Sequence, residues 1–361
     1  MRLVFLTNIQ DNEVLAKDVL DNNGIPLLTA GTEMSHSYIT SLKRKGILFV
    51  YVKDDDLSDI KEDIKLKEAK QHAIETLPEA FNCIASKDYM ATSKLIESID
   101  VLVNYIEEQD NINTSLYEVM LYDDYTYIHS IDTAMMAIFL GKKLGLEGKE
   151  LRELGISALL HDIGKTQIPH EIISKKSKLS DEEFELIKEH PTLGKKILEE
   201  AQCFSHKILA GVAHHHERYD GSGYPYGLRG KYISEFGRII SICDVFTAVT
   251  ANRSYRSRYE PNEAYELMLS GSGTLFDPKI IEVFKRYVFI YPLGSCVRLS
   301  NSQEGYIVKQ NPDFPDKPIV RILFDGKEDT ESKPYEIDLS KSTNIIITSI
   351  VTGKDDELIA Q

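Results

Sequence analysis

The sequence predicts a multidomain protein: a central all-α helical bundle, a small N-terminal α+β module, a helical linker and a small all-β C-terminal module. The 361 residues are more than one hydrophobic core usually holds. From about residue 116 to 287 the pattern is helical almost throughout. After residue 288 the chain changes to short apolar runs separated by turn residues, which is typical of about five strands of a small barrel or sandwich, and we expect a β-barrel-like module. We therefore expect four segments, residues 1–53, 54–115, 116–287 and 288–361.

Composition and charge exclude several classes of protein. A hydrophobic content of 42% and a charged content of 27% are those of a soluble globular protein, and no apolar run approaches the roughly 18 residues of a membrane helix. The net charge of −15 argues against binding to long nucleic acid, which relies on many contacts from Lys and Arg to phosphates. Four scattered cysteines argue against a cysteine-ligated zinc and fit a reducing compartment. We expect a cytoplasmic protein without membrane insertion.

The N-terminal module is expected to mix short strands with one helix. Strands are predicted around residues 13–19 and 25–28, on either side of a turn that ends at Gly24, because Asn and Gly accept the positive φ of tight hairpins. A helix over residues 35–45 and a buried strand over 47–52 follow. No set of catalytic residue types lies in this module or in the C-terminal one.

The helical linker carries an apolar stripe at helical spacing. Its members are Leu95, Ile99, Leu102, Val103 and Ile106. The stripe either packs against the domain that follows or forms the interface of a homodimer, and the sequence leaves both open.

The bundle is organised around the stretch His161-Asp162-Ile163-Gly164-Lys165, which ends an apolar helical run. A histidine and an aspartate at the buried end of a helix cost free energy unless a positive partner meets them, and a metal ion is such a partner. Neighbouring residues on a helix diverge by roughly 100°, so the two oxygens of Asp162 could each bind one ion. Gly164 is expected to end the helix, and Lys165 to point its ammonium at whatever the ions hold.

Five of the ten histidines and two aspartates take inward or terminal positions of successive apolar helices. Their separations of about 25 to 32 residues equal one helix plus a connection, so a bundle could gather them at one centre. The set is His129, His161, Asp162, His190, His215, His216 and Asp244. Seven imidazole and carboxylate ligands suit two divalent ions, with Asp162 as the bridge.

Several segments then carry a family resemblance. They are His161-Asp-Ile-Gly-Lys165, Ile168-Pro-His-Glu-Ile-Ile, Glu189-His-Pro191, the run from His215 to Pro225 with its Gly-Tyr-Pro, and Arg238 to Asp244. Together they resemble the HD-GYP family, a branch of the HD-domain metal phosphohydrolases, over about residues 116–287. The resemblance implies an all-α HD-type domain that hydrolyses a cyclic dinucleotide, most often cyclic di-GMP, to linear pGpG or to GMP. It also implies two divalent ions, for which we expect iron or manganese.

Carried over position by position, the family's metal ligands fall on the seven residues already named. The resemblance further implies catalytic roles for Lys165 and Asp162. The implied substrate contacts are Gly223, Tyr224, Arg253 and Arg256.

The chain departs from the family's pattern at four positions. Tyr125 stands where three-metal members have a glutamate, so we expect two ions. Thr247 stands where members commonly carry a second acid, and Ser254 replaces a proline; both differences bear on the fit of the substrate. His214 precedes the ligand pair and leaves open a shift of that pair by one residue.

Three functions remain in competition. The first is the cyclic dinucleotide phosphodiesterase, the second a non-catalytic module that senses a cyclic dinucleotide, and the third an HD hydrolase of another nucleotide such as cyclic GMP-AMP. The complete ligand set and Lys165 favour an enzyme over a sensor.

Overall fold

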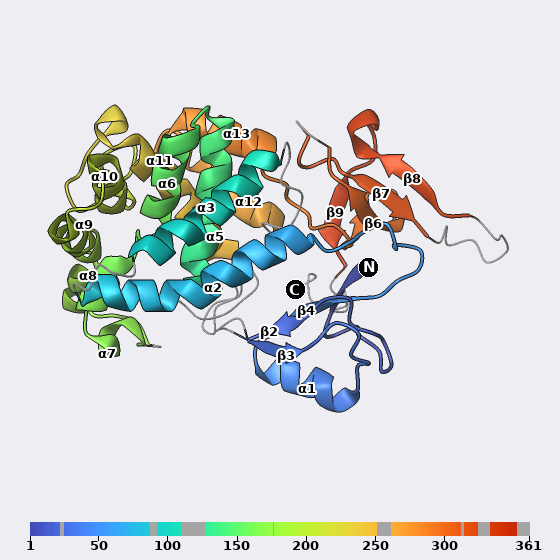
Figure 1. Ribbon diagram of the computed structural model, residues 1–361. Helices are drawn as coiled ribbons and strands as arrows, with labels where there is room; N and C mark the ends of the chain where they lie inside the picture. Colours follow the sequence, from blue (N-terminus) through green and yellow to red (C-terminus); the bar gives the residue numbers. More distant parts are fainter. Residues whose placement is uncertain are drawn as a thin grey trace. The chain divides into compact units, whose positions relative to one another are not determined.

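The computed structural model groups the chain into two compact units (Figure 1). Within the described residues, one unit comprises Met1–Asp63 together with the chain from Arg286 onward, and the other comprises the helices between Ile64 and Lys285. The described residues are 1–21, 25–86, 92–109, 127–175, 177–250, 261–311, 314–323 and 333–351.

The N-terminal part of the first unit is the predicted mixture of short strands and one helix. Its elements are β1 (Arg2–Phe5), β2 (Val19–Leu20), β3 (Pro26–Leu28), α1 (His36–Arg44) and β4 (Phe49–Val52). β1 pairs antiparallel with β4, and β2 with β3. Strand β1 was not predicted, because a single short apolar run carries no period that marks a strand. The predicted strand over residues 13–19 was largely wrong, because only β2 at its end and isolated bridges at Val14 and Leu15 form there. The predicted turn before Ile25 lies outside the described residues.

The C-terminal part of the same unit is one antiparallel sheet of five strands, as the sequence predicted. The strands are β5 (Cys296–Leu299), β6 (Glu304–Lys309), β7 (Ile319–Ile322), β8 (Tyr335–Asp338) and β9 (Ile347–Ile350), in the spatial order β8-β7-β6-β5-β9. The backbone N–H of Leu3 donates to the carbonyl of Gly294 at 2.9 Å. The Arg321 guanidinium lies 2.7 Å from Asp59 Oδ2. These bonds join residues from both ends of the chain within one unit.

The second unit is all helical. Its helices are α2 (Ile64–Ala85), α3 (Thr92–Glu108), α5 (Tyr127–Lys143), α6 (Gly148–Leu159), α7 (His170–Ile173), α8 (Asp181–Ile187), α9 (His190–Ala201), α10 (His206–His214), α11 (Glu235–Thr250), α12 (Pro261–Ser270) and α13 (Pro278–Tyr287), with 3₁₀ turns η2 (Ile163–Gln167) and η3 (Gly230–Tyr232). Helix α5 is the central one, buried from Ser130 to Gly141, and it packs against α2, α3, α6 and α11. Within the described part of the chain, no helix is long and apolar enough to span a bilayer.

The apolar stripe of α3 is buried inside its own chain. Leu95, Ile99, Leu102 and Ile106 are at most 1% exposed. Helix α3 packs against α2, α5 and α6. Of the two readings left open by the sequence, packing against the following domain is therefore the one observed.

One buried ion pair ties α2 to the central helix and gives a testable pH dependence. Asp132 Oδ1 on α5 lies 3.1 Å from Lys70 Nζ on α2. Burial raises the pKa of Asp132 to about 7, and Lys70 offsets only part of that effect. The Asp132 carboxyl therefore binds its proton more tightly in the folded protein than in the unfolded chain. Its protonation stabilises the fold fully below pH 4, and this contribution is lost as the pH rises through 7.

We expect the Asp132→Asn variant to lose this component of the pH dependence. A tenfold change in proton affinity is worth about 1.4 kcal/mol, so the component amounts to at most about 4 kcal/mol. Urea unfolding of the wild type and the variant at pH 5, 6, 7 and 8 measures it. The matched control is Asp100→Asn, which removes an exposed ion pair with Arg152 between α3 and α6. If both variants follow the wild-type slope, Asp132 does not titrate in this range.

Candidate metal centre

Five segments bring the seven predicted ligands together. His129 lies in the first turn of α5, and Asp244 lies inside α11. The other five lie at or just beyond helix ends: His161 and Asp162 after α6, His190 as the first residue of α9, and His215 and His216 after α10. A capping box at Ser180 starts α8, and Pro191 at the start of α9 fixes the turn from which His190 projects.

Gly164 brings two of these segments into contact, in a way the sequence did not predict. We expected it to end the helix that carries His161, but α6 already ends at Leu159, and Gly164 lies in η2. A Cβ at this position would come within 1.9 Å of the His190 carbonyl oxygen and 2.5 Å of the Gly194 nitrogen. The missing side chain lets η2 pack directly on α9, so the prediction of a helix end was wrong.

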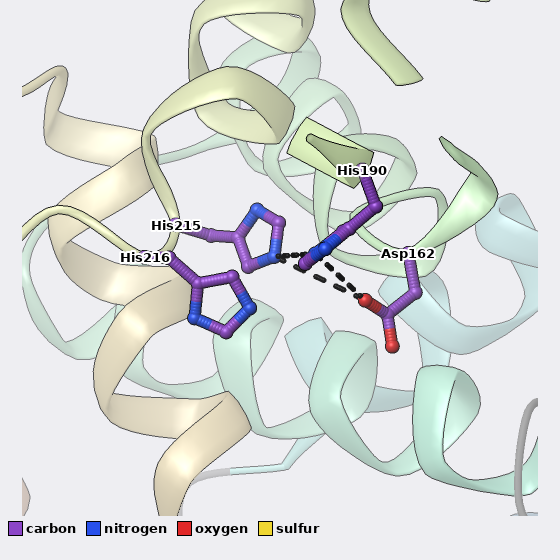
Figure 2. A group of neighbouring side chains, drawn as sticks. All are labelled: Asp162, His190, His215 and His216. Carbon is purple, nitrogen blue, oxygen red and sulfur yellow. Dashed lines mark hydrogen bonds and ion pairs between the residues drawn. The ribbon is translucent and has the colours of Figure 1, made fainter. Parts of the chain in front are cut away.

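Asp162 is shared between two groups of possible ligands. The first group is Asp162, His190, His215 and His216, whose ligand atoms all lie within 4.8 Å of one another (Figure 2). The second is His129, His161 and Asp162, and a third joins His161, His215 and Asp244. His190 Nε2 lies 3.3 Å from Asp162 Oδ1, and His161 Nε2 lies 3.4 Å from Asp162 Oδ2. Each oxygen of Asp162 therefore faces a different group, as a bridging carboxylate would.

Three of the histidines have their ring orientation fixed in the same way. In each, Nδ1 lies 2.7 Å from the carbonyl oxygen of the residue three positions earlier. The pairs are His161 with Ala158, His190 with Ile187, and His215 with Val212. A carbonyl only accepts, so each Nδ1 carries the proton and each Nε2 presents a lone pair in the neutral ring.

The lone pairs meet in the centre of the site. His190 Nε2 and His215 Nε2 lie 3.1 Å apart (Figure 2). Two lone pairs at this distance repel unless a cation lies between them. Within the described part of the chain, buried His161 Nε2 and Asp162 Oδ1 also have no hydrogen-bond partner, and leaving such atoms unpaired costs free energy. These atoms fit divalent metal ions.

The charge states of His215, His216, Asp162 and Asp244 suit metal ligands as well, whereas Asp162 raises the pKa of His161 against the effect of burial. Burial lowers the pKa of His216 to about 3, and it lowers the pKa of His215 well below its ordinary value. Burial alone would raise the pKa of Asp162, but Lys165 and His161 hold it well below its usual range. The neighbouring His129 and His161 likewise hold the pKa of Asp244 low against its burial. Neutral imidazoles and ionised carboxylates are the forms that bind metals.

The remaining predicted site residues are placed as follows. Lys165 donates to Asp162 Oδ2 at 2.6 Å, so its ammonium lies against the shared carboxylate. The ring of Tyr224 stacks on His216, with centroids 4.8 Å apart. His214 accepts a hydrogen bond from the Ser234 backbone at Nδ1 and belongs to none of the three ligand groups. The predicted contacts Arg253 and Arg256, and the departures Tyr125 and Ser254, lie outside the described residues.

Glu217 holds the loop that carries Tyr224, a role the sequence analysis did not assign. Its buried carboxylate accepts the backbone N–H of Tyr226 at 2.7 Å and of Leu228 at 2.9 Å. Gly223 allows the loop to fold back, since a Cβ there would come within 2.2 Å of the Arg218 nitrogen. The sequence does carry a signal for this role, because Glu217 lies directly between the histidines and a glycine-rich loop.

We expect Glu217→Gln to loosen this loop without removing the metal site. The side-chain amide of Gln would turn its NH₂ group toward the backbone N–H of Tyr226 or Leu228. A buried N–H group left without an acceptor reduces the stability of the loop by about 1–3 kcal/mol. The rate of tryptic cleavage at Arg218 and Arg229 should rise while metal content stays constant. The control is Asp220→Asn in the same loop, whose exposed carboxylate accepts from Ser222 N. Equal cleavage of wild type and Glu217→Gln would contradict the assigned role.

Comparisons with known proteins agree with this geometry. Residues 113–280 match the HD domain family, and residues 296–358 match a KOW domain associated with HD domain. Residues 113–280 therefore form an HD domain within this chain. This confirms the recognition made from the motifs.

Characterised relatives of the HD domain act on cyclic dinucleotides. The chain is 34% identical to the cyclic di-GMP phosphodiesterase PA4108 of Pseudomonas aeruginosa, over 70% of this chain and 60% of that protein. It is 40% identical to the 3'3'-cGAMP-specific phosphodiesterase 1 of Vibrio cholerae, over 40% of this chain and 33% of that protein. The chain thus matches less than two thirds of each relative's own length. The solved structure of Bd1817, an HDG"Y"P protein from Bdellovibrio bacteriovorus, shares the fold with a TM-score of 0.50 at 19% identity, covering 78% of this chain and 97% of that one.

Proposed function

We propose that the HD domain hydrolyses a phosphodiester bond of a cyclic dinucleotide, cyclic di-GMP in the first place, to linear pGpG or to GMP. The observation that carries this proposal is the convergence of five imidazoles and two carboxylates on one buried centre, with Asp162 common to two ligand groups. We propose residues 116–287 as the catalytic domain.

The centre would hold two divalent ions, for which we propose iron or manganese. His190, His215 and His216 would hold one ion, and His129 and His161 the other, with Asp162 between them and Asp244 beside the second. Two ions so placed supply a water nucleophile at neutral pH and positive charge for the phosphoryl oxygens. The other residues then have to bind and orient the substrate.

Lys165 and Tyr224 are the described residues best placed for that task. The Lys165 ammonium lies beside the shared carboxylate, from which it can reach an anionic oxygen above the centre. Tyr224, stacked on His216, offers its hydroxyl or its ring face to a phosphate or a base. Gly223 keeps the backbone of this loop close to the ligand segment. We propose that Arg253 and Arg256 bind the phosphate groups, since guanidinium groups suit them in charge and shape.

Turnover by the purified full chain tests this function. The protein is prepared without oxygen, its metal content is measured, and cyclic di-GMP is supplied with added Mn²⁺ or Fe²⁺. We expect about two ions per chain and the release of pGpG or GMP. Binding of cyclic di-GMP without turnover under every metal condition would instead support the sensor function.

A substrate panel tests the second candidate. The V. cholerae relative named for 3'3'-cGAMP favours including that dinucleotide beside cyclic di-GMP. A kcat/KM at least tenfold higher for 3'3'-cGAMP would reassign the substrate and leave the metal chemistry unchanged. We also propose a cytoplasmic location, which the four unpaired cysteines support.

A further inference from the structure

His129 differs from three of the other four ligand histidines in how its ring is held. The rings of His161, His190 and His215 each donate Nδ1–H to a backbone carbonyl. For His129 the structure shows a side chain at this position: Thr247 Oγ1 lies 3.3 Å from Nδ1. Thr247 lies on α11, one turn after Asp244, and is 2% exposed.

The contacts of Thr247 define the direction of this bond. Its Oγ1 lies 2.8 Å from the Cys243 carbonyl, 3.0 Å from the Asp244 carbonyl and 3.0 Å from Thr133 Oγ1. The two carbonyls only accept, so Thr247 donates its single hydroxyl proton to the nearer one, the Cys243 carbonyl. The lone pairs of Oγ1 are then left to accept a proton from His129 Nδ1.

We propose that Thr247 is a positioning residue of the metal centre, which holds His129 with Nδ1 protonated and so presents Nε2 as the ligand atom. Nε2 of His129 lies 3.0 Å from Oδ1 of Asp244, within hydrogen-bond distance, so an ion bound by both would replace a proton held between them. The sequence suggested that Thr247 affects the fit of the substrate. In the structure, Thr247 instead contacts Nδ1 of His129, the ring nitrogen opposite the one that faces Asp244.

This assignment has a consequence for the ion on the His129 side. The Nδ1 contact of His129 is 3.3 Å long, whereas those of His190 and His215 are 2.7 Å, so the ring of His129 is held less firmly. Its ligand group also has three members against four, so the ion bound by His129, His161 and Asp162 should exchange more readily than the ion bound by Asp162, His190, His215 and His216. The inference rests on the proposed metal centre but not on any particular substrate.

Calorimetric titration of the metal-free full chain with Mn²⁺ tests the proposal without nucleotide. We expect Thr247→Val, which keeps the shape and removes the hydroxyl, to weaken the looser of the two sites by about 10- to 100-fold and to leave the tighter site unchanged. Thr247→Ser should restore the affinity to within about threefold of the wild type. The matched control is Thr250→Val, which removes an equally buried hydroxyl bonded to the Phe246 carbonyl on the same helix.

A second readout follows the proton itself. In Zn²⁺-loaded protein with ¹⁵N-labelled histidine, we expect a slowly exchanging His129 Nδ1–H in the wild type and in Thr247→Ser, and rapid exchange in Thr247→Val. Unchanged binding of both ions by Thr247→Val, equal loss in Thr247→Ser, or no metal binding by the wild type would each overturn the proposal. Normal metal binding and proton exchange with no turnover would contradict the proposed function alone.

Discussion

The Asp162→Ala variant is expected to bind at most one divalent ion and to lose phosphodiesterase activity by more than about 10³-fold. Asp162 belongs to two of the three ligand groups, and its two oxygens face different histidines. Removing it therefore deletes a ligand from both positions at once. Several kcal/mol of transition-state stabilisation come from correctly held ions, and each 1.36 kcal/mol is tenfold in rate.

The experiment has to separate loss of the site from loss of the fold. Asp162 is buried and pairs with Lys165, so alanine leaves that ammonium without its carboxylate. The double variant Asp162→Ala/Lys165→Met removes both members of the pair and provides a neutral comparison. Metal content is read by elemental analysis, folding by thermal unfolding with EDTA present, and activity by nucleotide release. A folded Asp162→Ala variant that keeps both ions and its turnover would show that the shared carboxylate is wrongly assigned.

The sequence predicted the parts of this centre that depend on helix periodicity. The seven predicted ligand residues recur at intervals of about one helix plus its connection. In the structure all seven lie close together in three overlapping ligand groups. The capping box at Ser180, which starts α8, is a local signal of the same kind. A buried carboxylate is costly alone, and His129 lies 3.0 Å from that of Asp244 inside α11.

Other features depend on which segments approach each other, and no local pattern carries that information. Gly164 looked like a helix end because glycine is common there, yet its role is the contact between η2 and the His190 carbonyl. From the sequence, Thr247 only marked a position where related proteins commonly have an acid. In the structure its hydroxyl lies beside His129, more than a hundred residues away in the chain. The sequence could not decide what covers the apolar stripe on α3, because an apolar helix face carries no information about which surface packs on it.

The Lys165→Met variant is expected to lower kcat by about 10²- to 10³-fold while the metal content stays near that of the wild type. A charged donor aimed at the oxygens on which transition-state charge gathers is worth roughly 3–4 kcal/mol. The Lys165 side chain is 25% exposed and donates at 2.6 Å to Asp162 Oδ2, so it is held at the centre but open to a ligand on one side. Methionine keeps most of the chain's length and removes only the charge.

Two comparisons show whether Lys165 acts on the substrate or only on Asp162. Lys175→Met removes a similarly exposed lysine, which pairs with Glu183 at 2.6 Å on another part of the domain, and turnover should be unaffected. Loss of metal in Lys165→Met together with loss of kcat would mean that the lysine chiefly holds Asp162 in place. Loss of kcat with both ions retained and KM little changed would place its ammonium on the phosphoryl group in the transition state, because an interaction made only there lowers kcat without weakening substrate binding.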